Sequence, residues 1–211
     1  MKFRSLMLFV VSLILIGCEN RKNDLAEDDL NSVKKEFLNK IFLAEVEEGP
    51  FNMHYSIKTV FFSKDLISLF GEINVYDCMP HGRKHYEGKT YVKIKGQFKE
   101  IDLNDLFTSN SQKEFFRSYC ENYLKNDPMT YFGGKDPIKE KLAFEDIRTF
   151  VINKHFLSII FQPYVAVSSA DGPFVVKIPL DHLKGQWDSG NILLPLLQKT
   201  VLSKNFTSSS D

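Results

Sequence analysis

The sequence predicts an α+β fold in which a mostly antiparallel sheet packs with one or two helices. Apolar side chains recur at every second position in many segments between residues 55 and 178, which is typical of half-buried strands. Elsewhere, apolar side chains recur every three to four residues, as they do in amphipathic helices. The strands neighbour one another in sequence and the helices are separate from them, which favours an antiparallel arrangement.

The predicted strands are the segments that show the two-residue alternation. They cover residues 55–61, 67–75, 92–94, 98–103, 147–152, 156–161 and 174–178. Residues 63–65 read as a turn between the first two strands, and Gly96 allows a tight turn before the return strand. The strand over 156–161 is apolar on both faces, so we expect it to be central and covered by a helix.

The clearest predicted helix begins at Asn110 or Ser111. It ends at Asp127, because the residue before Pro128 avoids the helical region. Its apolar stripe consists of Phe115, Phe116, Tyr119, Cys120, Tyr123 and Leu124.

Local sequence signals add detail to the helices. Ser111 and Glu114 fit a capping box, in which each side chain accepts a hydrogen bond from the other residue's backbone N–H. Residues 32–43 form a second amphipathic candidate, and a short helix through Leu183 is expected after the last strand.

The N-terminus has the layout of a secretory signal. Lys2 and Arg4 supply positive charge, and the apolar run 6–16 follows, broken only by Ser12. As a helix, this run would be about 17 Å long at ~1.5 Å per residue, well short of the ~30 Å hydrocarbon core of a membrane. No later stretch approaches the ~20 apolar residues that a spanning helix needs.

The end of this segment resembles the lipobox of bacterial lipoproteins, with Leu15 and Gly17 before Cys18. The resemblance implies that Cys18 carries fatty-acyl chains such as palmitate and that residues 1–17 are removed. Several acyl chains together hold a protein firmly to a membrane. We therefore expect a protein of the bacterial cell envelope that faces the periplasm or the exterior; the alternative is an ordinary signal peptide ending near a cysteine.

The sequence predicts four parts of the chain. They are a signal peptide over 1–17, a flexible tether over 18–30, an α+β domain over 31–195 and a partly disordered tail over 196–211. The tether is mostly charged or amide in character, which suits a flexible segment. Without the two basic residues of the signal, the chain is slightly acidic, so it lacks the basic surplus of nucleic-acid binders and no nucleic-acid partner is expected.

Two stretches carry a resemblance to a known domain. The first contains His81 and Gly82, then Gly96 and the run 101–107; the second contains the run 161–164, then Gly172, the run 176–179 and Leu183. In this order and spacing they resemble the extracytoplasmic domain of unknown function that the anti-sigma factor RsiV shares with the deacetylase PdaC. RsiV uses this domain to bind lysozyme, so the resemblance implies a lysozyme-like protein as one partner to test.

Two cysteines remain once Cys18 is lipidated. Cys78 and Cys120 could pair in an oxidising compartment. The alternative is that each is a small buried apolar residue, since Cys120 lies on the apolar side of its predicted helix.

His81 and Tyr164 are the candidate binding residues. His81 either shapes its loop or contacts a ligand, and Tyr164 either fixes a corner of the sheet or makes an exposed aromatic contact. His81 and His85 have a spacing that could hold a metal on a helix. We place both in a Pro- and Gly-containing loop instead, so neither a metal nor a cofactor is expected.

The sequence contains no zinc-protease, nucleophile-elbow, P-loop or dinucleotide-binding motif, and no catalytic residue is assigned. It favours a lipid-anchored, non-enzymatic module that binds or senses a lysozyme-like protein or a cell-wall ligand such as peptidoglycan. The alternative is an enzyme, or an accessory domain of one, that acts on peptidoglycan or another glycan.

Overall fold

The computed structural model describes residues 27–41, 52–76, 83–127, 130, 142–163, 173–187 and 189–194. The chain divides into two units, Met1–Glu45 and Val46–Asp211. No helix among the described residues is long and apolar enough to cross a membrane.

The described residues of the first unit, 27–41, form a helix. It begins earlier than the predicted helix at 32–43 and includes the last residues of the predicted tether. Val33, Phe37 and Ile41 follow one another at i+4 spacing and share one face of it, as predicted. The boundary between the two units lies after Glu45, and the predicted domain over 31–195 stays a prediction.

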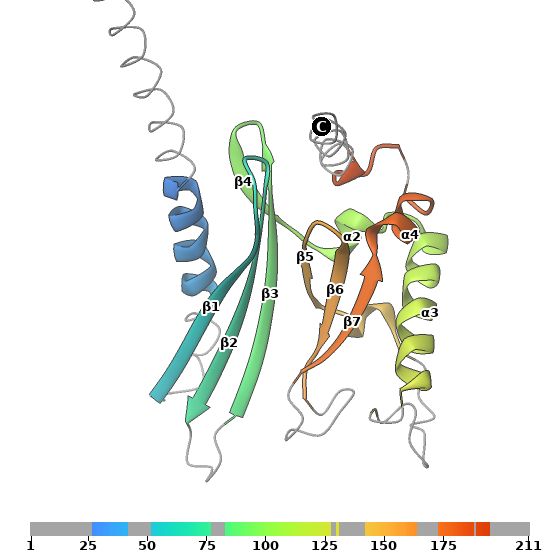
Figure 1. The fold of residues 1–211 in the computed structure, drawn as a ribbon, viewed down its shortest axis with the longest axis horizontal. Coiled ribbons are helices and arrows are strands. Elements are labelled where there is room, and N and C mark those ends of the chain that lie inside the picture. Colours follow the sequence, from blue (N-terminus) through green and yellow to red (C-terminus); the bar gives the residue numbers. More distant parts are fainter. Residues whose placement is uncertain are drawn as a thin grey trace, which may run out of the picture. The chain divides into compact units, whose positions relative to one another are not determined.

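The second unit begins with a four-stranded antiparallel sheet, here called sheet A (Figure 1). Its strands, in spatial order, are β1 (Asn52–Phe62), β2 (Leu66–Tyr76), β3 (Arg83–Ile94) and β4 (Gln97–Ile101). The turn after β1 is fixed by Ser63, whose Oγ accepts a hydrogen bond from the Leu66 N–H at 3.0 Å. Lys95 and Gly96 both have positive φ, 51° and 85°, which suits the two-residue turn between β3 and β4.

A second antiparallel sheet, sheet B, has the order β5-β6-β7. It consists of β5 (Thr149–Ile152), β6 (Phe156–Phe161) and β7 (Phe174–Pro179). The central place of β6 confirms the prediction made from its two apolar faces. At the β5–β6 turn, the Asn153 side chain accepts hydrogen bonds from the N–H groups of His155 and Phe156 at 2.8 and 2.9 Å.

The described residues of this unit also form four short or medium helical segments. They are α2 (Leu103–Leu106), α3 (Asn110–Asn126), the 3-10 turn η1 (Phe144–Asp146) and α4 (Leu180–Lys184). The predicted return strand over 98–103 ends earlier, at Ile101, because Asp102 caps α2 and its carboxylate accepts a hydrogen bond from the Asn104 N–H at 2.7 Å.

The start of α3 is as predicted, but its cap is not. Ser109 is the N-cap, and it forms the capping box with Gln112. The predicted box of Ser111 and Glu114 is wrong, because Ser111 already lies inside the helix, whereas Ser109 keeps the extended backbone that a cap requires.

Sheet B lies between sheet A and α3, so the fold has three layers (Figure 1). Its face toward α3 belongs to the main core, with side chains that include Leu157, Ile159, Val176, Phe116, Cys120 and Leu124. Its opposite face contributes Val151 and Ile160, which pack with Tyr86 of β3. This arrangement confirms the predicted α+β class.

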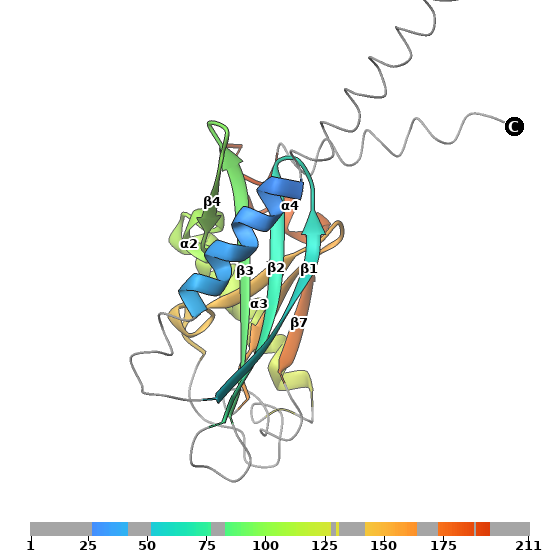
Figure 2. The same cartoon turned by 90° about the vertical axis from the view of Figure 1, so that its left-hand side faces the viewer.

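The first half of β3 corrects the sequence analysis, which treated the residues around His81 and His85 as a loop. His85 lies within β3, which pairs with β2 from Arg83 onward (Figure 2). The inward positions of this strand include Gly88 and Thr90, which are small or polar. The alternation of apolar side chains that predicts a strand is therefore missing here.

These small inward residues allow β5 to approach sheet A closely. The Ile152 N–H donates to the Ser68 Oγ at 2.9 Å, and the Ser68 Oγ lies 3.0 Å from the Thr90 Oγ1. A Cβ atom at Gly88 would lie 2.6 Å from the Phe150 carbonyl oxygen. A larger side chain at Gly88 would therefore push the two sheets apart.

We predict that Gly88→Ala lowers the free energy of unfolding by about 1–3 kcal/mol, the usual cost of overpacking. The added methyl group meets backbone, which cannot move aside as a flexible side chain can. Gly185→Ala is the matched control, because nothing lies within 4 Å of a Cβ atom there. Urea denaturation of both variants measures the difference, and equal stabilities would contradict the close approach.

Candidate functional site

Most of the sequence-predicted site residues lie outside the described residues: Cys18, Cys78, His81 and Tyr164. Cys120 is described, and it is a free thiol, completely buried on the core face of α3. Burial raises the pKa of Cys120 to about 12. Its position favours the role of a small apolar core residue over the predicted pairing with Cys78.

His85 also differs from its predicted place, since it lies in a strand. Its Nε2 is 2.7 Å from the Glu87 Oε1, two residues along the same face of β3. Within the described ranges, no group of three or more His, Cys, Asp or Glu side chains could hold a metal ion.

Gln162 joins the end of β6 to the beginning of β3. Its Oε1 accepts a hydrogen bond from the Tyr86 N–H at 3.0 Å, and its Nε2 donates to the Tyr86 carbonyl oxygen. Strand β4 pairs only with the later part of β3, so the Gln162 amide takes the place of a neighbouring strand at Tyr86. Residues 83–86 and residues 161–163 are thereby held side by side. These described residues, called the stems, flank the segments that contain His81 and Tyr164.

Next to these stems, one face of sheet A extends beyond sheet B. Cross-strand pairing places Ser56, Glu72 and Tyr86 in one row, and His54, Asn74 and Lys84 in the next. Tyr86 is buried where sheet B covers sheet A. Its ring stacks on the Phe70 ring, with 6.0 Å between the ring centroids. The neighbouring side chains on the same face form a surface that we call the platform: His54, Ser56, Lys58, Glu72, Asn74, Tyr76 and Lys84.

The platform combines exposed aromatic and basic groups with a partly exposed amide and carboxylate. Tyr76 is 53% exposed, and its ring meets the His54 ring edge to face at 5.6 Å. The Lys84 Nζ lies 3.6 Å from the Glu72 carboxylate. Burial raises the pKa of Tyr86, and the Glu72 carboxylate raises it further. This combination can stack on a ligand and form hydrogen bonds with it.

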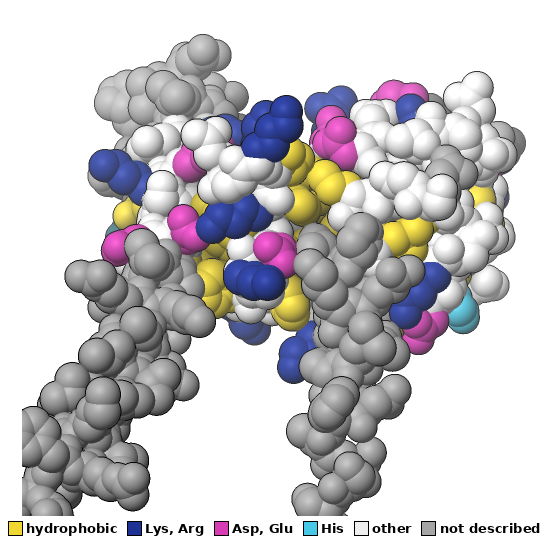
Figure 3. Space-filling model, turned by 90° about the horizontal axis from the view of Figure 1, so that it is seen from above, with side chains coloured by type: hydrophobic (Ala, Val, Ile, Leu, Met, Phe, Trp, Pro, Cys, Tyr) yellow, Lys and Arg dark blue, Asp and Glu magenta, His cyan; other side chains and the backbone are white. Residues whose placement is uncertain are grey.

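The opposite end of the molecule has a different surface. Figure 3 views the structure from above, the end where the β1–β2 and β3–β4 turns lie, and basic and acidic side chains are interspersed on it. Hydrophobic side chains also lie between them in this view. The platform is the candidate binding surface because its exposed groups include an aromatic ring, a hydroxyl and two lysines.

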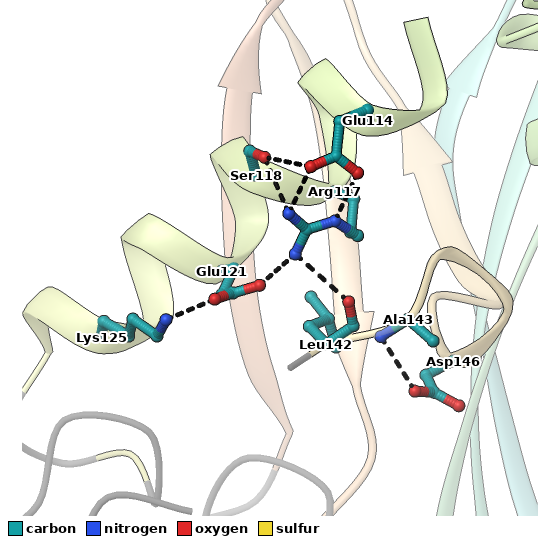
Figure 4. Close-up of polar contacts among 8 residues, drawn as sticks. All are labelled: Glu114, Arg117, Ser118, Glu121, Lys125, Leu142, Ala143 and Asp146. Carbon is teal, nitrogen blue, oxygen red and sulfur yellow. Dashed lines mark hydrogen bonds and ion pairs between the residues drawn. The ribbon is translucent and has the colours of Figure 1, made fainter. Parts of the chain in front are cut away.

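A network of charged side chains on α3 was not identified from the sequence (Figure 4). Arg117 donates to Glu114 at 2.6 and 2.9 Å, to Glu121, and to the Leu142 carbonyl oxygen at 3.3 Å. Lys125 donates to the other oxygen of Glu121. The only sequence signal was the i+3 and i+4 spacing of these charges along the helix.

This network holds the segment before η1 against α3. Arg117 and Glu121 are each only 8% exposed, so each needs its partners. Hydrogen bonds from Lys125 and then from Arg117 lower the pKa of Glu121, and the hydrogen bond to Glu114 is the largest cause that raises the pKa of Arg117. Because the charges satisfy one another, we interpret the network as structural.

Comparison with known proteins gives a family for part of this unit. Residues 104–181 match the model of DUF3298, a protein family of unknown function. The DUF3298 region runs from α2 into α4, and it agrees with the resemblance to the RsiV-like domain of unknown function. No curated protein matches the sequence.

Solved structures of DUF3298 proteins are also similar. A member from Bacteroides fragilis has 16% identity and a TM-score of 0.48 over 75% of this chain. A family protein from Pseudomonas aeruginosa has 16% identity and a TM-score of 0.49 over 70% of this chain. The alignments cover 65% and 66% of those chains, so this chain spans just under two thirds of their length.

We predict that Glu121→Gln lowers the free energy of unfolding at pH 7 by about 1–3 kcal/mol, the range for hydrogen bonds to charged groups. The pKa of Glu121 is lower in the folded protein, so its contribution is present above the unfolded carboxyl pKa of about 4.3 and is lost as the pH falls through the folded value. Denaturation between pH 3 and 7 tests this, with the exposed Glu145→Gln as control. A pH-independent difference between variant and wild type would contradict it.

Proposed function

We propose that this chain is a lipid-anchored protein of the bacterial cell envelope that binds a cell-wall or protein ligand through the platform, without catalysis. One observation carries the proposal. The platform is exposed beside the described stems of the segments that contain His81 and Tyr164, the two residues that the sequence singles out for binding.

The side chains of the platform support binding. Exposed tyrosine is a common anchor in protein interfaces, because it buries a large rigid ring at a small cost in conformational entropy. Tyr76 has the largest exposed fraction among the large hydrophobic side chains described. Asn74 and Glu72 lie next to it on the same face and offer directional hydrogen bonds.

The same contacts favour binding over proton transfer. The Glu72 carboxylate is paired with Lys84, whose Nζ lies 3.6 Å away, and it has no second carboxylate beside it on the described part of the platform. The more deeply buried charges, Arg117 and Glu121, bind one another on α3. We therefore infer a surface that holds a ligand and leaves it unchanged.

We predict that Tyr76→Ala weakens binding to its ligand by about 1–2 kcal/mol, or roughly five- to thirtyfold, as expected for loss of an interface tyrosine. The assay uses the full chain in detergent, with isolated peptidoglycan and lysozyme as the two probes. Tyr123→Ala is a matched control, because Tyr123 is 43% exposed on α3 and also meets one aromatic ring edge to face.

Three outcomes would count against this proposal. They are binding to neither probe, equal weakening by both variants, and release of sugar or acetate from the peptidoglycan. The last outcome would favour the enzymatic alternative.

The anchor is tested separately. We predict that wild-type chain in bacteria fed labelled palmitate incorporates the label and sediments with membranes. Cys18→Ser should abolish labelling and release a folded protein, because the thiol that accepts lipid is gone. Membrane fractionation with a thermal melt of the released protein measures both effects. Labelling that persists in Cys18→Ser would contradict the lipobox interpretation.

A further inference from the structure

The charges of the platform indicate what kind of ligand it fits. We propose that the platform binds a carboxylate-bearing glycan strand. This inference rests on the proposed function and adds the chemical class of the ligand.

The first argument is charge. Lys58 and Lys84 are exposed on the platform, and its one carboxylate, Glu72, is partly buried. Lys84 lies 3.6 Å from Glu72, which compensates that carboxylate. Two lysines against one carboxylate leave the platform with net positive charge, which attracts anionic groups.

The second argument is spacing. Lys58 and His54 are four residues apart along β1, and His54 shares its row with Lys84, two strands away. With about 3.4 Å per residue and about 4.8 Å between strands, Lys58 and Lys84 are separated by about 17 Å. This separation is between backbone positions, and an extended ligand with negative groups along its length can contact both lysines.

The third argument is the aromatic and neutral polar content. The edge-to-face pair of His54 and Tyr76 presents ring surface on which the C–H faces of a sugar can stack. Asn74 and Ser56 offer an amide and a hydroxyl, which pair with sugar hydroxyls. A glycan strand that carries carboxylates on its sugars or on attached peptides combines all three features, since its rings, hydroxyls and charges recur along its length.

The experiment compares isolated peptidoglycan with the same material after its carboxylates are converted to amides. The full wild-type chain in detergent should sediment with untreated peptidoglycan, and its binding should fall at least tenfold on the amidated form. The double variant Lys58→Glu, Lys84→Glu should bind the untreated form about tenfold less tightly, because two attractions become repulsions.

The matched control is Lys64→Glu, Lys154→Glu. It makes the same change in net charge at two exposed turn residues at the other end of the strands, and we expect binding within twofold of wild type. Circular dichroism melts check that both double variants fold, and the charge-neutral Lys58→Gln, Lys84→Gln replaces the first if it does not.

The outcomes separate this inference from the proposed function. Undiminished binding to amidated peptidoglycan, or equal losses in the two double variants, would overturn the glycan inference. Tyr76-dependent binding to lysozyme in place of peptidoglycan would also overturn it and leave the proposed function standing. Failure to bind either probe would remove both.

Discussion

The rest of the second unit depends on the close contact between β5 and sheet A. At this contact, the residues of sheet A are small or hydroxylated: Ser68, Gly88 and Thr90. The Ser68 hydroxyl accepts a hydrogen bond from the Ile152 N–H, which β6 does not reach from the other side of β5. An edge strand would otherwise leave such groups without partners, and buried backbone groups are costly to leave unpaired.

This contact explains why both faces of sheet B are apolar. One face packs on α3 and contributes to the main core, and the other meets Tyr86 and its neighbours on sheet A. Strands in the middle layer need apolar side chains on both faces, and β6 has them. Gln162 completes the junction, because its amide pairs with the backbone of Tyr86 where no strand is available. Beyond that point sheet A continues alone, and its uncovered face is the platform.

Much of the fold could be predicted from the sequence because alternation of apolar side chains is a local signal. It located β1, β2, β5, β6 and β7, and proline after Asp127 fixed the end of α3. The first half of β3 was missed for a physical reason. Gly88 and Thr90 are inward-facing because a close backbone contact needs small side chains, and such residues carry no apolar signal.

The candidate site was harder to predict than the fold. His81 and Tyr164 were chosen from the sequence alone. The platform, in contrast, is formed by the register in which β1, β2 and β3 pair. His54, Asn74 and Lys84 are far apart in sequence and become neighbours only through pairing of β1, β2 and β3. The N-cap of α3 was also hard to predict, because Ser109 and Ser111 carry the same hydroxyl group. The choice of Ser109 depends on the Gln112 side chain, whose Oε1 accepts hydrogen bonds from the N–H groups of both Thr108 and Ser109.

The position of the platform within the chain bears on how its specificity could arise. The DUF3298 region, residues 104–181, supplies α3, sheet B and much of the main core. The platform comes from β1, β2 and the start of β3, which precede that region. Core side chains must keep their packed volumes, because cavities and overpacking both destabilise a protein. Solvent-facing positions such as His54 and Tyr76 are free of that restriction, so substitutions at the platform can change the ligand while the core beneath it remains the same.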